Sequence, residues 1–163
     1  MPNDLAALAL PVADRLRAAR QTVGVSESST GGLISAALLA VPGASAYFQG
    51  GGVIYTKAAR SALLGVGDEA MAGIRSSSEP YALLKARRIR ELLGTTWGLA
   101  ETGAAGPTGN RYGDAAGHTC IAVTGPVERV ITLETGSADR EANMWAFTRR
   151  AFELFAAALA EAR

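Results

Sequence analysis

The segment from Glu27 to Gly32 combines residue types that suit nucleophilic or anion-binding chemistry. It reads ESSTGG and follows the short apolar run TVGVS, and a helical pattern begins directly after its paired glycines. A serine held where a strand turns into a helix can project its hydroxyl out of the sheet toward a pocket, as the nucleophile of an amide hydrolysis requires. The segment therefore makes Ser28 a candidate nucleophile.

The backbone of the same turn suggests anion binding. A helix start has N–H groups without intrahelical partners and lies at the positive end of the helix dipole. We expect four amides to face an oxyanion or a phosphate group, those of Ser29, Thr30, Gly31 and Gly32. The alternative is that the hydroxyls merely cap the helix, which Ser and Thr commonly do.

The elements that must position these residues alternate between strands and helices. Hydrophobic periodicity and turn residues predict strands at 22–26, 52–55, 97–101, 119–123 and 127–133, and helices at 4–20, 32–39, 57–64, 78–93 and from 138 onward. Pro11 would kink the first helix or delay its start. The pattern predicts a three-layer α/β/α sandwich around a mixed, mainly parallel sheet of five or six strands.

The bulk composition limits the classes of function. With 163 residues, 48% hydrophobic and 19% charged, the chain is typical of one globular domain spanning residues 1–163. A formal net charge of +1 gives no basic surface for nucleic acid. The N-terminal apolar stretch is too short to span a membrane and lacks the features of a signal peptide, so we expect a cytoplasmic protein without a membrane partner.

No set of metal ligands is visible in the sequence, so we expect a metal-free site without a cofactor. The single cysteine, Cys120, excludes an internal disulfide and is predicted to be a small buried hydrophobe in a strand. His118 at the start of that strand is predicted to be half-exposed. The basic residues of the fourth helix are predicted to form a solvated face; they are Lys85, Arg87, Arg88 and Arg90.

Five motifs, in this order, resemble those of the CinA C-terminal domain family. They are ESSTGG, VPGASAYF at Val41–Phe48, GGVIYT at Gly51–Thr56, GAAGP at Gly103–Pro107 and ADRE at Ala138–Glu141. The resemblance spans roughly residues 5–160. That family includes the bacterial nicotinamide-nucleotide deamidases of pyridine nucleotide salvage. The resemblance implies a three-layer fold and an amidohydrolase that converts nicotinamide mononucleotide to nicotinate mononucleotide and ammonia. We also expect a homo-oligomer.

The resemblance also implies roles for individual residues. Ser28 would be the nucleophile, and Tyr55 would orient the catalytic pair or the substrate. Glu27 would orient Ser28 or Lys57, or bond backbone amides at the turn. The residues expected to bind substrate are Glu27, Ser29, Thr30, Gly31, Gly32, Gly103, Ala105, Gly106 and Arg140.

One position departs from the family pattern at the expected general base. The family typically reads Tyr-Ser-Asn-Glu-Ala-Lys after its second strand, and this chain reads YTKAAR, with Arg60 in place of the lysine. Arginine stays protonated, so it can supply only fixed positive charge. Because general-base assistance contributes about 10²–10⁴ in rate, we expect slow deamidation unless another group substitutes. Lys57, three residues earlier on nearly the same helical face, is the candidate base, and the alternative is a solvated surface lysine.

Two further differences remove positive charge that could hold a phosphate. Asp114 lies where the family usually has a Lys-Pro pair, and Met144 lies where it usually has a second arginine. Two other functions therefore stay open. The chain could be a catalytically lapsed nucleotide- or phosphate-binding protein, or a structural or partner-binding module.

Overall fold

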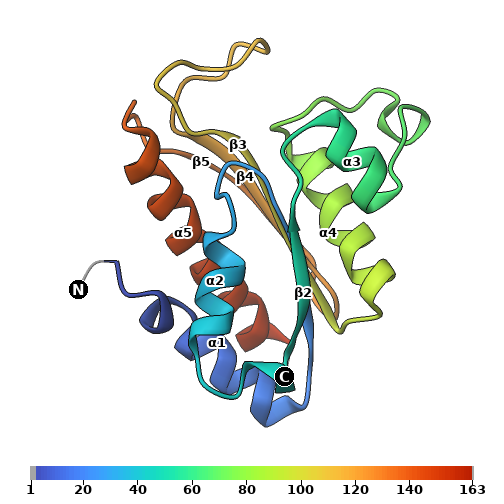
Figure 1. Cartoon of the computed structure of the whole chain (residues 1–163), viewed down its shortest axis with the longest axis vertical. Coiled ribbons are helices and arrows are strands. Elements are labelled where there is room, and N and C mark those ends of the chain that lie inside the picture. The colour runs from blue at the N-terminus through green and yellow to red at the C-terminus, as the bar shows by residue number, and fades with distance from the viewer. Residues whose placement is uncertain (1–2, 163) are drawn as a thin grey trace.

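The computed structural model describes residues 3–162, which form a five-stranded mixed sheet covered by helices on both faces (Figure 1). The strands are β1 (Val23–Glu27), β2 (Phe48–Val53), β3 (Trp97–Ala104), β4 (His118–Thr124) and β5 (Arg129–Glu134). The helices are α1 (Leu5–Ala19), α2 (Leu33–Ala40), α3 (Lys57–Leu64), α4 (Glu79–Leu93) and α5 (Arg140–Glu161), with short 3₁₀ turns η1 (Ala44–Ala46) and η2 (Glu69–Met71).

The strand order is β2-β1-β3-β4-β5. β1 pairs in parallel with β2 and with β3, whereas β3 with β4 and β4 with β5 are antiparallel. The mixed sheet between helical layers predicted from the sequence is confirmed, with equal numbers of parallel and antiparallel pairings.

The two faces of the sheet are packed differently. Helices α1, α2 and α5 cover one face, where the main core includes Trp97 and Phe155 with their ring centroids 5.6 Å apart in an edge-on arrangement. On the other face α4 packs closely over small side chains, with α3 beyond it. A Cβ added to Gly98 would lie 2.1 Å from the carbonyl oxygen of Ala86, so this close approach requires glycine.

Two predicted boundaries were wrong, those of β2 and β3. β2 begins at Phe48 rather than near Gly52, because its glycines pair through backbone groups and give no side-chain alternation for a pattern to detect. The helix predicted at 4–20 is confirmed as α1, which begins at Leu5, so Pro11 does not delay its start. β3 extends to Ala104, so Gly103 lies in a strand and not in the loop that follows.

The parallel pairing of β1 with β3 brings two functional segments together. Because the carboxyl ends of adjacent parallel strands share one edge of the sheet, the turn after β1 and the loop after β3 lie at the same end of the molecule. None of the helices within residues 3–162 has the length and apolar character needed to cross a membrane.

Candidate active site

Ser28 is half-buried directly after β1 and lines a cavity of about 440 Å³. The cavity brings together five of the residues predicted for the site: Ser28, Tyr55, Lys57, Arg60 and Gly103. It also contains residues that the sequence did not indicate, among them Asp68, Arg75, Tyr81, Arg111 and Tyr112. Four of these lining side chains are cationic and one is a carboxylate, so the cavity suits an anionic ligand.

The carboxylate of Glu27 occupies the start of α2. It is fully buried, and it accepts hydrogen bonds from the amides of Gly32 (3.1 Å), Ile34 (3.0 Å) and Ser35 (2.9 Å). Of the predicted roles of Glu27, the bonding of backbone amides is therefore the one observed. The prediction that the Gly32 amide would face an external anion is wrong, because an internal carboxylate already satisfies it.

A second buried carboxylate, from Glu101 on β3, occupies the rest of the turn. It accepts from the amides of Ser28 (3.0 Å) and Thr30 (2.9 Å), and from the hydroxyls of Ser29, Thr30 and Thr119. The Gly31 amide bonds the carbonyl oxygen of Ser28. The turn is thus a rigid support that fixes Ser28, and the expected anion site at its Thr30 and Gly31 amides is not present.

Arg60 and Lys57 converge on Asp68. The buried Arg60 guanidinium donates to the carbonyl oxygen of Val66 (3.1 Å) and to Asp68 (2.8 Å), and the exposed Lys57 ammonium lies 3.2 Å from the same carboxylate. The hydrogen bond from Lys57, followed by that from Arg60, lowers the pKa of Asp68. The Lys57 ammonium is thus paired with Asp68, and within residues 3–162 no hydrogen bond joins it to Ser28, so the geometry does not support Lys57 as the base.

Tyr55 and Arg140 are brought together across the fold. The Arg140 guanidinium donates to the Tyr55 hydroxyl (3.1 Å) and to the carbonyl oxygen of Gly106, and so orients the Tyr55 ring at the cavity. The carbonyl oxygen of Ala105 accepts instead from Asn143 of α5 (2.7 Å). Arg140, Ala105 and Gly106 therefore support the loop after β3 and do not line the cavity.

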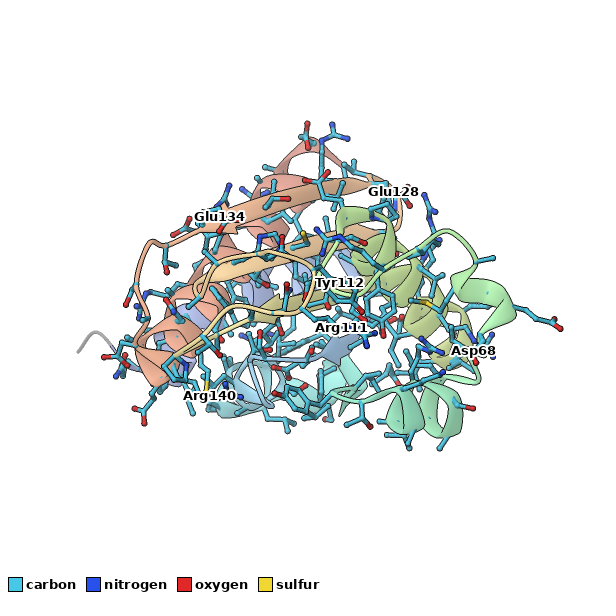
Figure 2. All side chains as sticks on the ribbon, turned by 90° about the horizontal axis from the view of Figure 1, so that it is seen from above. Asp68, Arg111, Tyr112, Glu128, Glu134 and Arg140 are labelled. Carbon is cyan, nitrogen blue, oxygen red and sulfur yellow. The ribbon has the colours of Figure 1, made fainter. Side chains whose placement is uncertain are left out.

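The same loop carries Arg111 and Tyr112 over the cavity. Figure 2 looks onto this end of the molecule and shows the two side chains between Asp68 on the α3 side and Arg140 on the α5 side. Arg75 and Arg111 both approach the Tyr112 ring, at 5.2 and 5.0 Å from its centroid. The hydrogen bond from Arg111 lowers the pKa of the Tyr112 hydroxyl.

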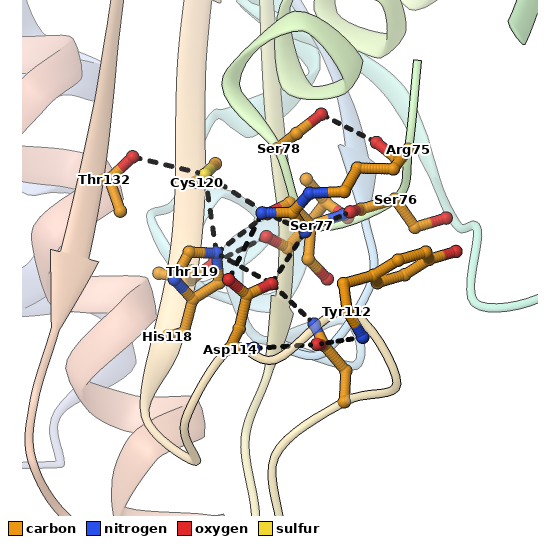
Figure 3. A network of polar contacts seen from close by, with 12 residues as sticks. Arg75, Ser76, Ser77, Ser78, Tyr112, Asp114, His118, Thr119, Cys120 and Thr132 are labelled. Atoms are coloured by element: carbon orange, nitrogen blue, oxygen red, sulfur yellow. Dashed lines mark hydrogen bonds and ion pairs between the residues drawn. The ribbon is translucent and has the colours of Figure 1, made fainter. Parts of the chain in front are cut away.

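Asp114 holds Arg75 in place, and His118 lies next to Asp114 (Figure 3). Asp114 binds Arg75 through both carboxylate oxygens, at 2.7 and 3.2 Å.

The His118 ring contacts the carbonyl oxygen of Ser77 (2.8 Å) and the carboxylate of Glu134. Its side chain is 6% exposed, so the prediction of a half-exposed histidine was wrong. Burial lowers the pKa of His118, but the bonds to Glu134 and Ser77 and the charge of Asp114 raise it overall. Cys120 is buried, as predicted.

Lys85 contradicts the expectation of a solvated basic face. It is fully buried between α4 and the sheet, where its ammonium donates to the carbonyl oxygen of Glu101 (2.8 Å) and lies 5.1 Å from the centroid of the Tyr81 ring. Burial lowers the pKa of Lys85 to about 8, against the opposing charges of Glu101 and Glu27. A lysine with such a pKa can exchange a proton near neutral pH.

Some of the missed residues left a signal in the sequence. Lys85 lies four residues after Tyr81 and four before Ile89, on the helical stripe that α4 buries, so its spacing marks it as inward-facing. Glu101 is the one charged residue of β3, a strand with a mostly apolar sequence. No comparable signal marks Asp68 or Arg75, which reach the cavity from irregular segments.

A family model described as the CinA C-terminal domain matches residues 5–159. The chain belongs to the CinA C-terminal domain family. The CinA-like protein of Prochlorococcus marinus is 41% identical over 124 residues, which are 76% of this chain and 29% of that protein. The CinA-like protein of Myxococcus xanthus is 40% identical over 142 residues, 84% of this chain and 33% of that protein. The chain thus spans about a third of the length of these CinA relatives.

Solved CinA structures share the fold. A competence-damaged protein (CinA) superfamily protein from Klebsiella pneumoniae has a TM-score of 0.90 at 28% identity, over 98% of this chain and 99% of that one. A competence/damage inducible protein from Agrobacterium tumefaciens has a TM-score of 0.85 at 30% identity, over 96% of each chain. The resemblance seen in the motifs is therefore confirmed at the level of family and fold.

Proposed function

We propose that this CinA-family chain hydrolyses the carboxamide of a pyridine mononucleotide and releases ammonia, with Ser28 as the nucleophile. The observation that carries the proposal is that Ser28 opens into a cavity lined by four cationic side chains. The family resemblance, which implies a serine nucleophile at this position, supports the same role.

The cavity has the size and chemistry for such a ligand. Its volume of about 440 Å³ lies within the range typical of small-molecule sites. Tyr55, Tyr81 and Tyr112 supply flat aromatic surface for a pyridine ring. Arg75 and Arg111, which flank the Tyr112 ring, supply positive charge for a phosphate group.

The proposed reaction follows the usual course of serine acyl transfer. The Ser28 oxygen attacks the carboxamide carbon, and the carbonyl oxygen becomes an oxyanion that the fixed charge of Arg60 can stabilise. Collapse of this intermediate expels ammonia and leaves an acyl ester on Ser28. Water then hydrolyses the ester and restores the serine.

A second candidate is a protein that binds the nucleotide without turning it over. The observation in its favour is that both cations expected to assist Ser28, Arg60 and Lys57, are held by Asp68. Such a protein would use the same cavity but would lack a group to take the hydroxyl proton.

Ammonia release and binding measured on the same samples separate these functions. We expect the wild-type chain to bind nicotinamide mononucleotide and to release ammonia. Ser28→Ala should reduce turnover by about 10³-fold or more, because no nucleophile remains, while the dissociation constant changes by only a few-fold. Ser45→Ala, at an exposed serine outside the cavity, is the matched control and should behave as wild type.

Two results would contradict the proposal. Binding without ammonia release would favour the nucleotide-binding protein. Turnover that persists undiminished in Ser28→Ala would show that another group attacks the carboxamide.

A further inference from the structure

A lysine lies buried beneath the cavity with no carboxylate to neutralise it. Lys85 is 0% exposed, and within residues 3–162 its ammonium has no ion-pair partner. Its contacts are the carbonyl oxygen of Glu101 and the face of Tyr81, which is itself a cavity residue. A buried ammonium with one neutral acceptor is a group that gives up its proton readily.

The register of the sheet fixes the position of Lys85 along the strands relative to Ser28. Ser26 of β1 is paired with Ala100 of β3, so Glu101 is level with Glu27, the residue immediately before Ser28. Because the Lys85 nitrogen bonds the carbonyl oxygen of Glu101, it lies at the carboxyl end of β1.

The α4 contacts fix the side of the sheet. A Cβ on Gly24 would lie 2.9 Å from Leu93 and 3.4 Å from Ile89, so Gly24 faces α4. Alternate residues of a strand share a face, so Ser26 faces α4 as well. Ser28 comes directly after the strand and lines the cavity together with Tyr81 of α4.

The direction of α4 points the lysine toward the serine. Its C-terminal part lies over Gly24, whereas Tyr81 near its N-terminus shares the cavity wall with Ser28. Side chains of a helix lean toward its N-terminus, so the Lys85 stem leads from the middle of α4 toward Ser28. The hydroxyl of Ser26 is buried with no partner among the described residues, which leaves a second polar group on this face of β1.

We propose that Lys85 takes the hydroxyl proton of Ser28 when Ser28 attacks. Glu101 holds both groups, since its carboxylate accepts from the Ser28 amide and its carbonyl oxygen accepts from Lys85. The identity of the substrate rests on the proposed function, whereas the activation of Ser28 by Lys85 is independent of it. Within residues 3–162 the Ser28 hydroxyl has no hydrogen-bond partner, and the proposal requires a hydrogen bond to Lys85 when Ser28 attacks.

The proton is conserved through the reaction. Neutral Lys85 accepts the Ser28 proton as the oxygen bonds to the carboxamide carbon. The resulting ammonium returns that proton to the departing nitrogen, and ammonia leaves as the C–N bond breaks. Lys85 then accepts a proton from the attacking water and returns it to the serine oxygen when the ester bond breaks.

The groups around Lys85 set the pH at which it can act. Burial lowers its pKa to about 8, while Glu101 of β3 and Glu27 of β1 favour its charged form. On the same side of the sheet, His118 and Cys120 of β4 contact the carbonyl oxygen of Ser77 and not the lysine. About half of the Lys85 side chains are therefore neutral at pH 8.

Covalent labelling of Ser28 with phenylmethylsulfonyl fluoride tests the proposal without any nucleotide. Mass spectrometry follows the rate of Ser28 modification in the full chain between pH 6 and pH 10. We expect a wild-type rate that rises to a plateau with its midpoint near pH 8. Lys85→Met and Lys85→Arg should each slow labelling by about 10²-fold or more and remove the inflection, since neither side chain accepts a proton at these pH values. Arg87→Met, which removes an exposed cation from the same helix, should label as wild type.

Labelling of Lys85→Met at the wild-type rate with the same midpoint would overturn the proposal and leave Lys85 a structural residue. Wild-type labelling without an inflection near pH 8 would overturn it equally, and that measurement requires no variant. If Ser28 is labelled with the expected dependence on Lys85 but no ammonia is released from nicotinamide mononucleotide, only the proposed substrate is contradicted.

Discussion

Glu101 connects the two groups on which the proposed chemistry depends. Its side chain fixes the backbone of Ser28 on one face of the sheet, and its main chain accepts from Lys85 on the other. The hydroxyls of Ser29, Thr30 and Thr119 complete the partners of the carboxylate, so a charge with 0% exposure is fully satisfied. Lys85 has far fewer partners than Glu101: among residues 3–162 its ammonium contacts only the carbonyl oxygen of Glu101 and the Tyr81 ring. The charged form of Lys85 is therefore poorly stabilised.

We predict that Lys85→Met stabilises the chain, and more so at low pH. The unfolded lysine titrates near 10.5 and the folded one near 8, so between these values the unfolded state binds more protons and wild-type stability rises with pH. Below pH 8 wild type bears the full cost of the buried charge, roughly 3 kcal/mol, which methionine avoids at similar volume. Urea unfolding of wild type and variant at pH 6.5 and pH 10.5 measures the difference.

The gain from Lys85→Met should therefore be larger at pH 6.5 than at pH 10.5. Arg87→Met is again the control, because an exposed cation carries no burial cost, and its effect should be small at both pH values. A gain that is the same at both pH values would show that Lys85 titrates alike in the folded and unfolded chain.

At the scale of elements, the first turn of α2 is capped by a carboxylate from the preceding strand. Its N-cap residue, Gly32, has no side chain to accept a hydrogen bond and adopts a φ of 103°, which favours glycine. Glu27 supplies the missing acceptor, five residues before Gly32 and on the other side of the turn. The strand and the helix are thus joined by charge-assisted hydrogen bonds as well as by the chain itself.

We predict that Glu27→Gln lowers the free energy of unfolding by roughly 2 kcal/mol or more. An amide keeps the size of the side chain but has one acceptor oxygen, and its NH₂ group then faces backbone N–H donors. Urea unfolding at pH 7 gives the value, with Glu141→Gln at an exposed position of α5 as the control. A loss equal to that of the control would mean that water can replace the carboxylate at this helix start.

The element scale also shows what the sequence could predict. Apolar periodicity located α1, α4 and α5 and four strands to within a few residues, since each buries a regular stripe or face. The pattern failed for β2, where Gly50 to Gly52 carry no side chains. At the site, motif resemblance located Ser28, Tyr55 and Arg60, whereas Arg75 and Asp68 depend on loop paths set by tertiary packing and leave no local pattern.

For the whole molecule we predict that Phe155→Ala costs about 3–5 kcal/mol of stability, because it leaves a cavity against Trp97 in the main core. This loss is a large part of the stability of a typical domain, so the midpoint of urea unfolding should fall markedly. Leu39→Ala, at a side chain that is 60% exposed, should change stability by less than about 0.5 kcal/mol. Two separate unfolding transitions in Phe155→Ala would show that the core is not one cooperative unit.

The adjacency of β1 and β3 has a consequence for how the chain is made. Val23 is the register partner of Trp97, which lies 74 residues later in the chain, and α1 is covered by α5. A ribosome adds roughly 5–20 residues per second, so the apolar faces of α1 and β1 emerge several seconds before their partners exist. During that interval chaperones and proteases compete with folding, and the turn that carries Ser28 forms only once the strand carrying Glu101 has been synthesised.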